Sequence, residues 1–216
     1  MPSLQELLKQ ADLYKKAADQ SKKASRDTVS SNEDICNTNA CLAAFEYLTD
    51  LSKQPDLIIT EDTIKTLHCL ICQETGSTPP GQYRDVQIPV YESKYTFADP
   101  DEIPRLMKHL TDQIQSSRAA LHPIELAAMA HKRLMDIQPF SKENENTALL
   151  LMNLILANAG YCTISIPLSR QSNYLNELSI SRKRYDMEPF SKFIAECVID
   201  AELQLSEDKT VKNNTR

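Results

Sequence analysis

The segment from Thr147 to Ala159 constrains the fold of this chain more than any other part of the sequence. It reads Thr-Ala-Leu-Leu-Leu-Met-Asn-Leu-Ile-Leu-Ala-Asn-Ala, so a helix formed here is apolar nearly all round. Such a helix needs other elements packed around it, and Gly160 directly after it is a typical stop signal. The segment therefore predicts a central helix in a helical bundle.

Apolar side chains at helical spacing predict further helices on both sides of this segment. Ser3 followed by Glu6 is a capping pattern, and Thr60 has the residue type and position of an N-cap. The predicted ranges are 3–23, 31–54, 60–72, 100–117, 122–137, 170–181 and 189–205. The fold class that follows is all-α.

Residues 74–101 interrupt this helical pattern. Gly76, Pro79, Pro80 and Gly81 break a helix, and β-branched residues alternate with polar ones between 85 and 91. We expect a small β-hairpin flap at about 86–97. Its candidate partner-binding side chains are Val86, Ile88, Val90 and Tyr91.

Composition limits the class of protein. The chain has 216 residues, of which 41% are hydrophobic, enough for one sizeable core. We expect an N-terminal helix and linker at 1–29, one domain at 30–205 and a disordered tail at 206–216. A formal net charge of -6 argues against nucleic acid as a partner, and the lack of a long apolar run argues against a membrane span. We expect a cytoplasmic protein, and delivery into another cell stays open.

The cysteines predict neither a metal site nor a redox site. Cys69 and Cys72 form the one CxxC pattern among six cysteines, and they lie in a helical apolar segment. No second Cys or His pair completes a zinc set, so buried free thiols are the preferred interpretation.

The stretch before the central helix reads Ile137-Gln-Pro-Phe-Ser-Lys-Glu-Asn-Glu-Asn146. It resembles the signature loop of the Fic family, which in active members reads His-Pro-Phe-x-Asp/Glu-Gly-Asn-Gly-Arg-x-x-Arg. Three more blocks resemble the family in the same order, at 81–90, 101–107 and 122–131. The resemblance implies a Fic-like helical bundle whose flap aligns an extended segment of a target protein.

The resemblance also implies that the chemistry is lost. Active members transfer AMP from ATP to a hydroxyl of a protein, which requires a general base and a metal ion. The base position holds Gln138, whose amide does not accept a proton near neutral pH. The position of the metal-binding carboxylate holds Lys142, a cation that repels Mg²⁺.

The phosphate-binding positions of the motif are also changed. Glu143 and Glu145 replace its two glycines, and each places a negative charge where a phosphate would bind. Asn146 and Leu149 replace its two arginines. The residues that build the loop remain: Pro139 and Phe140 for the turn and core, and Asn144 to cap a helix starting near Thr147. His131 lies two helical turns before Gln138, too far back to serve as a replacement base.

Two interpretations fit the segment that begins at Ser30. With Asp34 it resembles the inhibitory helix of the family, in which a Glu binds the second Arg of the motif, the position that Leu149 occupies here. The alternative is an ordinary helix start, in which Ser30 is an N-cap and acidic residues follow in the first turn.

Three functions follow from this resemblance. The first is an inactive Fic-fold pseudoenzyme without a cofactor, which binds a protein through the flap or through the surface around the filled site. The second is a residual or altered nucleotidyltransferase, which would use ATP and Mg²⁺. The third is a regulator that forms a homodimer or pairs with an active Fic protein.

Overall fold

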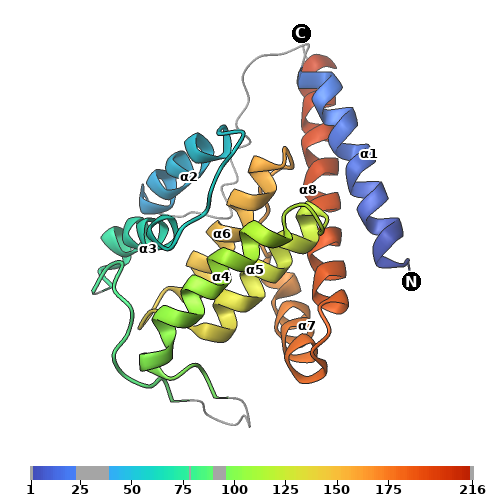
Figure 1. Ribbon diagram of the computed structural model, residues 1–216. Helices are drawn as coiled ribbons and strands as arrows, with labels where there is room; N and C mark the ends of the chain where they lie inside the picture. The colour runs from blue at the N-terminus through green and yellow to red at the C-terminus, as the bar shows by residue number, and fades with distance from the viewer. Residues whose placement is uncertain (1, 23–38, 78, 90–95, 215–216) are drawn as a thin grey trace. The chain divides into compact units, whose positions relative to one another are not determined.

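A computed structural model describes residues 2–22, 39–77, 79–89 and 96–214, and all its regular elements are helical (Figure 1). The predicted all-α fold class is therefore confirmed, whereas the predicted β-hairpin is not seen: within the described residues, both 86–89 and 96–99 lack strand structure. The α-helices are α1 (Leu4–Lys22), α2 (Asn39–Ser52), α3 (Glu61–Thr75), α4 (Ile103–Ser117), α5 (Pro123–Ile137), α6 (Asn144–Asn158), α7 (Gln171–Arg184) and α8 (Glu188–Asn214). Short 3-10 helices, η1 (Pro100–Glu102) and η2 (Leu168–Arg170), precede α4 and α7.

The chain divides into two compact units. One comprises residues 36–158 and therefore contains α2 to α6, and the other comprises residues 1–35 and 159–216. This division does not follow the predicted domain limits, because the N-terminal helix belongs with the C-terminal helices rather than to a separate leading segment. Helix α8 also continues past Ser206 to Asn214, in a region where the sequence predicted a disordered tail.

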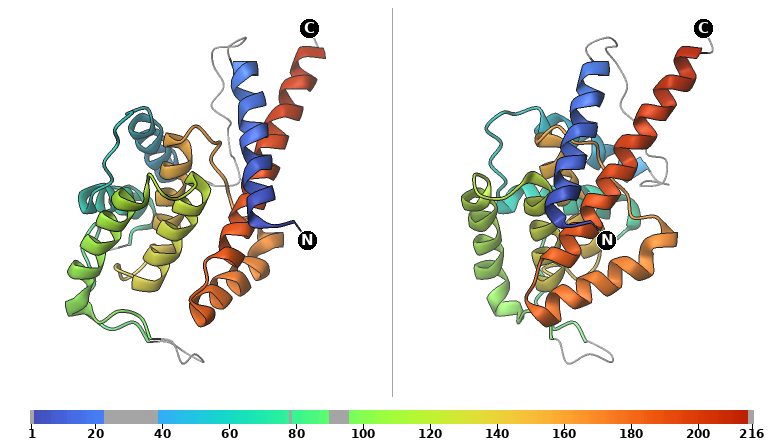
Figure 2. Two further views of the ribbon diagram at one scale, coloured as in Figure 1. Left: turned by 45° about the vertical axis from the view of Figure 1, so that its right-hand side comes forward. Right: turned by 90° about the vertical axis from the view of Figure 1, so that its right-hand side faces the viewer.

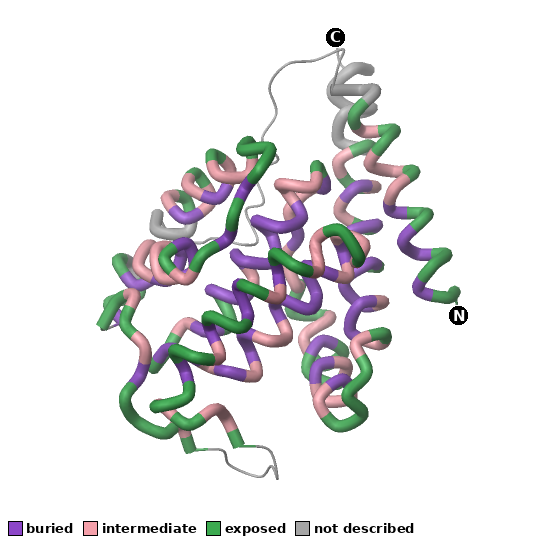
Figure 3. Tube along the Cα trace, viewed as in Figure 1, coloured by how far each residue is buried: buried purple, intermediate pink, exposed green. Residues whose placement is uncertain are grey.

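The unit of residues 36–158 is built around α5 and α6. These helices pack against each other, α4 covers α5, and α2 and α3 pack on α6 (Figure 1). Both central helices are buried along most of their length, as Figure 3 shows. The apolar sequence of α6 is explained by this position, since neighbouring helices cover most of its surface.

Local signals start several helices where the sequence predicted them. Ser3 and Glu6 form the predicted pair at α1, with Ser3 N donating to Glu6 Oε2 at 2.7 Å. Thr60 accepts from the backbone N–H of Thr63 at 3.2 Å and starts α3. Helix α6 starts at Asn144, three residues before the predicted Thr147.

The second unit joins α1 to the C-terminal helices. Helices α1 and α8 lie side by side in both views of Figure 2, and α7 packs on α8. The hydroxyl of Tyr161 hydrogen-bonds Asp12 on α1, and Lys15 Nζ lies 4.6 Å from the centre of the Tyr161 ring. Contacts with α1 thus fix the segment that follows Gly160.

The structure also bears on the predictions about membrane-spanning helices and free cysteines. No helix within the described part of the chain has the length and apolar character needed to cross a membrane. Cys69, Cys72, Cys162 and Cys197 are free thiols. The predicted burial is confirmed for Cys72, whereas Cys69 is half-buried.

Candidate functional site

The loop between α5 and α6, residues 138–143, begins with a left-handed turn at Gln138. Its φ is 49° and its backbone N–H donates to Leu134 O at 2.9 Å, which ends α5. The side-chain Nε2 of Gln138 donates to Met135 O at 3.2 Å, so the amide is turned back toward the last turn of its own helix. Position 138 therefore offers an amide and no proton acceptor of useful strength.

Phe140 and Asn144 close the loop on itself. Oδ1 of Asn144 accepts from Phe140 N at 2.9 Å, while its Nδ2 donates to Phe140 O at 2.7 Å. Both side chains are buried. The sequence predicted that Asn144 caps a helix starting near Thr147. Instead, Asn144 is the first residue of α6, and its side chain holds the main chain of the loop.

His68 on α3 fixes the loop from the opposite side. Its ring stacks on Phe140, with centroids 3.7 Å apart and planes 7° from parallel. Gly81 N–H donates to Nδ1 at 2.8 Å, so Nε2 carries the proton and donates to Lys142 O at 3.3 Å. Burial lowers the pKa of His68, which favours this neutral form.

Glu143 occupies the left-handed region of φ and ψ, where glycine is favoured. Its φ is 60°, a conformation that costs a residue with a Cβ about 1 kcal/mol. Its carboxylate accepts from Ser77 Oγ at 3.3 Å and from Asn146 Nδ2 at 2.7 Å. The negative charge of Glu143 is thus held within the loop. Burial raises the pKa of Cys72 to about 11, and the charge of Glu143 adds to that rise.

The remaining side chains of the loop and of the first turn of α6 differ in exposure. Lys142, Glu145 and Asn146 are exposed, whereas Leu149 is half-buried. Glu145 lies inside α6, so it has an ordinary helical backbone. The backbone therefore favours glycine at position 143 and not at position 145.

Arg84 joins the loop to the flap, defined here by its two described arms, residues 86–89 and 96–99. The buried guanidinium donates to Gln138 O at 2.7 Å, to Val86 O at 2.8 Å and to Ala98 O at 2.5 Å. Burial lowers the pKa of Arg84, an effect that the nearby charge of Asp99 opposes. The arms and the loop thus share one set of hydrogen bonds.

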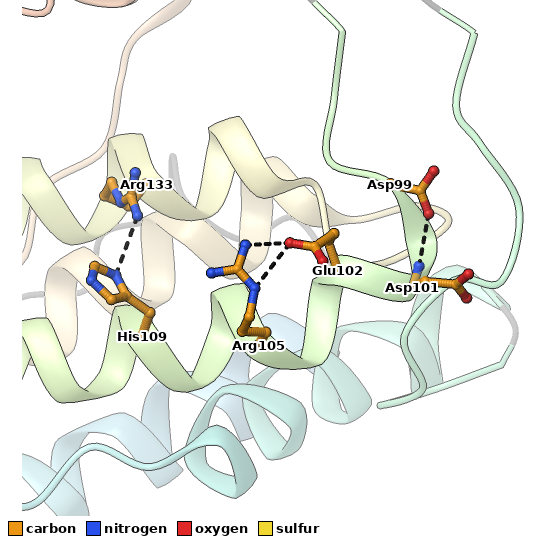
Figure 4. A network of polar contacts seen from close by, with 6 residues as sticks. All are labelled: Asp99, Asp101, Glu102, Arg105, His109 and Arg133. Carbon is orange, nitrogen blue, oxygen red and sulfur yellow. Dashed lines mark hydrogen bonds and ion pairs between the residues drawn. The ribbon is translucent and has the colours of Figure 1, made fainter.

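From the end of the second arm, further polar contacts involve η1, α4 and α5 (Figure 4). Asp101 N donates to Asp99 Oδ1 at 3.0 Å, Arg105 pairs with Glu102, and Arg133 Nη2 donates to His109 Nδ1 at 3.4 Å. Arg105 and Glu102 are both exposed, so their pair contributes little to stability.

Not all candidate residues named from the sequence belong to the described part of the chain. Ser30, Asp34, Val90 and Tyr91 lie outside the described residues. His131 is fully buried on α5, so it is not presented at the surface of the loop. Within the described part of the chain, no group of three or more His, Cys, Asp or Glu side chains has the arrangement of a metal site.

Comparison with known proteins identifies the family. Residues 58–156, which include the loop, α3, the described flap arms and Arg84, match the sequence model of the Fic/DOC family. The chain belongs to the Fic/DOC family. The resemblance seen in the loop sequence is thereby confirmed.

Relatives of this chain include Fic proteins that are named protein adenylyltransferases. The one from Aedes aegypti is 33% identical over 156 residues, which cover 72% of this chain and 31% of that protein. The one from Nematostella vectensis is 33% identical over 164 residues, covering 74% of this chain and 38% of that protein. This chain thus spans about a third of the length of these relatives.

Solved Fic structures have a similar fold. A Fic-domain signalling protein from Bacteroides thetaiotaomicron matches with a TM-score of 0.72 at 27% identity, covering 76% of this chain and 68% of that one. Fic-1 from C. elegans has a TM-score of 0.71 at 24% identity, covering 80% of this chain and 51% of that one. The second likeness concerns the fold alone.

Three residues that position the Fic loop were missed or misjudged from the sequence. An isolated histidine such as His68 is typical of a helix cap or a surface position, yet its ring is 2% exposed and stacked on Phe140. No sequence pattern predicted the contact of Ser77 with Glu143 or that of Arg84 with Gln138. The block Gly81-Gln-Tyr-Arg84, already part of the family resemblance, was the one available pointer to Arg84.

Proposed function

We propose that this chain is a degenerate Fic protein that no longer transfers a nucleotide and acts by binding another protein. The observation that carries the proposal is the carboxylate of Glu143, held in the loop by Ser77 and Asn146. An anion bound there would meet this charge at close range, and the repulsion would amount to about 4 kcal/mol at an effective dielectric constant of 20.

The residues present do not fit a nucleotide with Mg²⁺. Mg²⁺ prefers carboxylate and phosphate oxygens, and the exposed ammonium group of Lys142 stands at the motif position of the metal ligand. Gln138 donates its side-chain N–H to Met135 O and supplies no general base. Loss of a general base alone typically slows such a transfer by about two to four orders of magnitude.

Calorimetry with ATP and Mg²⁺ on the purified chain tests this proposal. We expect no binding tighter than the millimolar range, which corresponds to about 4 kcal/mol. A transfer assay with labelled ATP and a cell lysate should give no signal above that of the boiled protein. Micromolar binding, or labelled protein above that background, would exclude the proposal.

A restored variant checks whether the scaffold itself is intact. The changes are Gln138→His, Lys142→Asp, Glu143→Gly, Glu145→Gly and Asn146→Arg, and together they should restore nucleotide binding. The matched control keeps Gln138 and carries the other four changes, so it should bind the nucleotide without transferring it. The adenylyltransferase from Aedes aegypti serves as the positive control.

The flap supports protein binding as the remaining activity. Its first arm has no regular secondary structure and leaves Val86 61% exposed, with Ile88 half-buried. A segment of this kind can pair with an extended peptide, and apolar side chains add specificity. Capture experiments should therefore lose a partner when Val86 and Ile88 are both changed to Ser. A partner set unchanged by this double variant would exclude the flap as the binding surface.

The partner has two candidates that can be separated directly. A second copy of this chain would appear as a dimer in sedimentation, whereas an active Fic protein would change in activity when this chain is added.

The relatives named adenylyltransferase favour one further function, a residual transferase that uses Lys142 for direct phosphate contact. The labelled-nucleotide assay, repeated with Lys142→Ala, decides that alternative.

A further inference from the structure

Arg84 is the one buried arginine in the described part of the chain, with 3% of its surface exposed. Its guanidinium donates to main-chain carbonyls and to one side-chain amide oxygen. The carbonyl acceptors are those of Gln138 at 2.7 Å, Val86 at 2.8 Å, Ala98 at 2.5 Å and Ile137 at 3.4 Å, and the amide acceptor is Gln87 Oε1 at 3.4 Å. A charge buried in this way is stabilised by aligned carbonyl dipoles.

These acceptors come from three separate segments. Val86 and Gln87 lie in the first flap arm, Ala98 lies in the second, and Gln138 opens the loop. The backbone of Arg84 adds to this connection, because its N–H donates to Pro139 O at 2.9 Å. Between the arms themselves, Gln87 Nε2 donates to Phe97 O at 3.2 Å.

The geometry of these bonds depends on the planar fork of arginine. Several N–H groups point in fixed, different directions, so one side chain reaches both arms and the loop at once. The ammonium group of lysine has a single nitrogen and cannot span the three segments. In the loop, Arg84 contacts main-chain carbonyls alone. These contacts therefore do not depend on which side chains stand at the catalytic positions of the motif.

We propose that Arg84 is the positioning residue of the flap and that it makes the loop of residues 138–143 a structural support for both flap arms. The inference rests on the proposed function and deepens it, since it identifies what holds the partner-binding arms in place. It also gives a reason why Pro139, Phe140 and Asn144 persist beside altered catalytic positions: the loop must keep its shape to present the carbonyls of residues 137–139.

The test is backbone ¹⁵N relaxation on the full chain, which measures motion on the picosecond to nanosecond scale. In the wild type we expect order parameters of about 0.8 or higher for Val86–Ile88 and Phe97–Ala98. In Arg84→Lys these values should fall by about 0.15 or more in both arms, while those of 137–143 fall less. A smaller decrease in either arm of a folded variant, or wild-type values below about 0.6, would overturn the proposal.

Two controls separate positioning from general stability. Arg105→Lys changes an exposed arginine whose ion-pair partner is Glu102, and it should leave both arms unchanged. Leu134→Ala removes a fully buried side chain of α5; it should lower the melting temperature without mobilising the arms. If Arg84→Lys does not fold, Arg84→Gln is judged by the same thresholds, and if neither folds the wild-type values decide.

The result is independent of the test of the proposed function. Nucleotide transfer or the absence of any partner would remove the proposed function without changing the order parameters. Mobile arms in the wild type would remove the present inference and leave the question of catalysis untouched.

Discussion

Asn146 Nδ2 donates a hydrogen bond to Glu143 Oε2 at 2.7 Å, which joins two positions of the Fic motif that both carry altered residues. In the family motif these positions hold a glycine and an arginine. Here an acidic side chain and an amide take their places and contact each other, with Ser77 as a second donor. The side chains at the two altered positions are therefore hydrogen-bonded to each other, and Ser77 adds a further bond to Glu143.

This arrangement also explains how Glu143 keeps a glycine-like backbone. The left-handed conformation costs about 1 kcal/mol, and each side-chain hydrogen bond recovers part of that cost. With the left-handed turn at Glu143 in place, Phe140 and the carbonyls of residues 137–139 lie where His68 and Arg84 contact them.

Paired substitutions at 143 and 145 should have opposite effects on stability. Both Glu143→Gly and Glu143→Ala remove the carboxylate, so their difference isolates the backbone. We expect the Gly variant to be more stable by about 1 kcal/mol, because φ is positive there. At Glu145, inside α6, the Ala variant should be more stable than the Gly variant by about 0.5–1 kcal/mol. Urea denaturation of the four proteins gives both differences, and the same sign at both positions would contradict the assigned backbone.

Asn144 should be among the most sensitive positions of the loop. Asn144→Ala leaves a buried N–H and a buried C=O of Phe140 without their partners, which should cost about 2–3 kcal/mol in the free energy of unfolding. The exposed Asn146 provides the comparison, since its change to Ala should cost about 0.5 kcal/mol or less. Equal effects in urea denaturation would argue that Asn144 does not hold the loop.

His68 should make the free energy of unfolding depend on pH. Burial lowers the pKa of the folded-state ring below its ordinary value of 6.5, so the unfolded chain takes up a proton first as the pH falls. Stability should therefore decline from about pH 6.5 downward until the folded-state pKa is passed, and His68 should add no dependence above pH 7. Denaturation of the wild type and of His68→Asn at pH 7.5 and 5.5 should show the steeper decline in the wild type.

The matched control for His68 is the exposed His109 on α4. His109→Asn should keep the steeper decline of the wild type, because it leaves the contacts of His68 unchanged. A His68→Asn variant that loses as much stability between the two pH values as the wild type would show that other groups dominate. Glu143 is the charged group that faces His68 and favours its protonated form, so Glu143→Gln should enlarge the pH effect.

Gly81 should tolerate substitution less well than Gly76, although both have positive φ. A Cβ at Gly81 would lie 2.5 Å from Cys69 Sγ and 3.3 Å from Lys65 O, whereas a Cβ at Gly76 meets no heavy atom within 4 Å. We expect Gly81→Ala to cost about 2 kcal/mol or more, and Gly76→Ala to cost about 1 kcal/mol from backbone strain. Adding Cys69→Ala to Gly81→Ala should recover part of the loss. Equal melting temperatures for the two single variants would exclude close packing at Gly81.

Local patterns predicted much of the helical framework. The capping pairs at Ser3 and Thr60 start α1 and α3, and His122 with Glu125 starts α5, because these contacts link residues two or three positions apart. The apolar sequence of residues 147–159 likewise predicted the buried α6. The start of α6 was placed too late, because Asn144 bonds backward to Phe140 instead of forward into the helix.

The sequence by itself determined the helices and the residues present at each motif position, since both depend on neighbours along the chain. Only the tertiary structure decided what those residues contact. Arg84 reaches Gln138 across 54 positions, and His68 reaches Lys142 across 74. No periodicity encodes such contacts, because they arise when packed helices bring distant main-chain carbonyls within hydrogen-bond distance of a buried side chain.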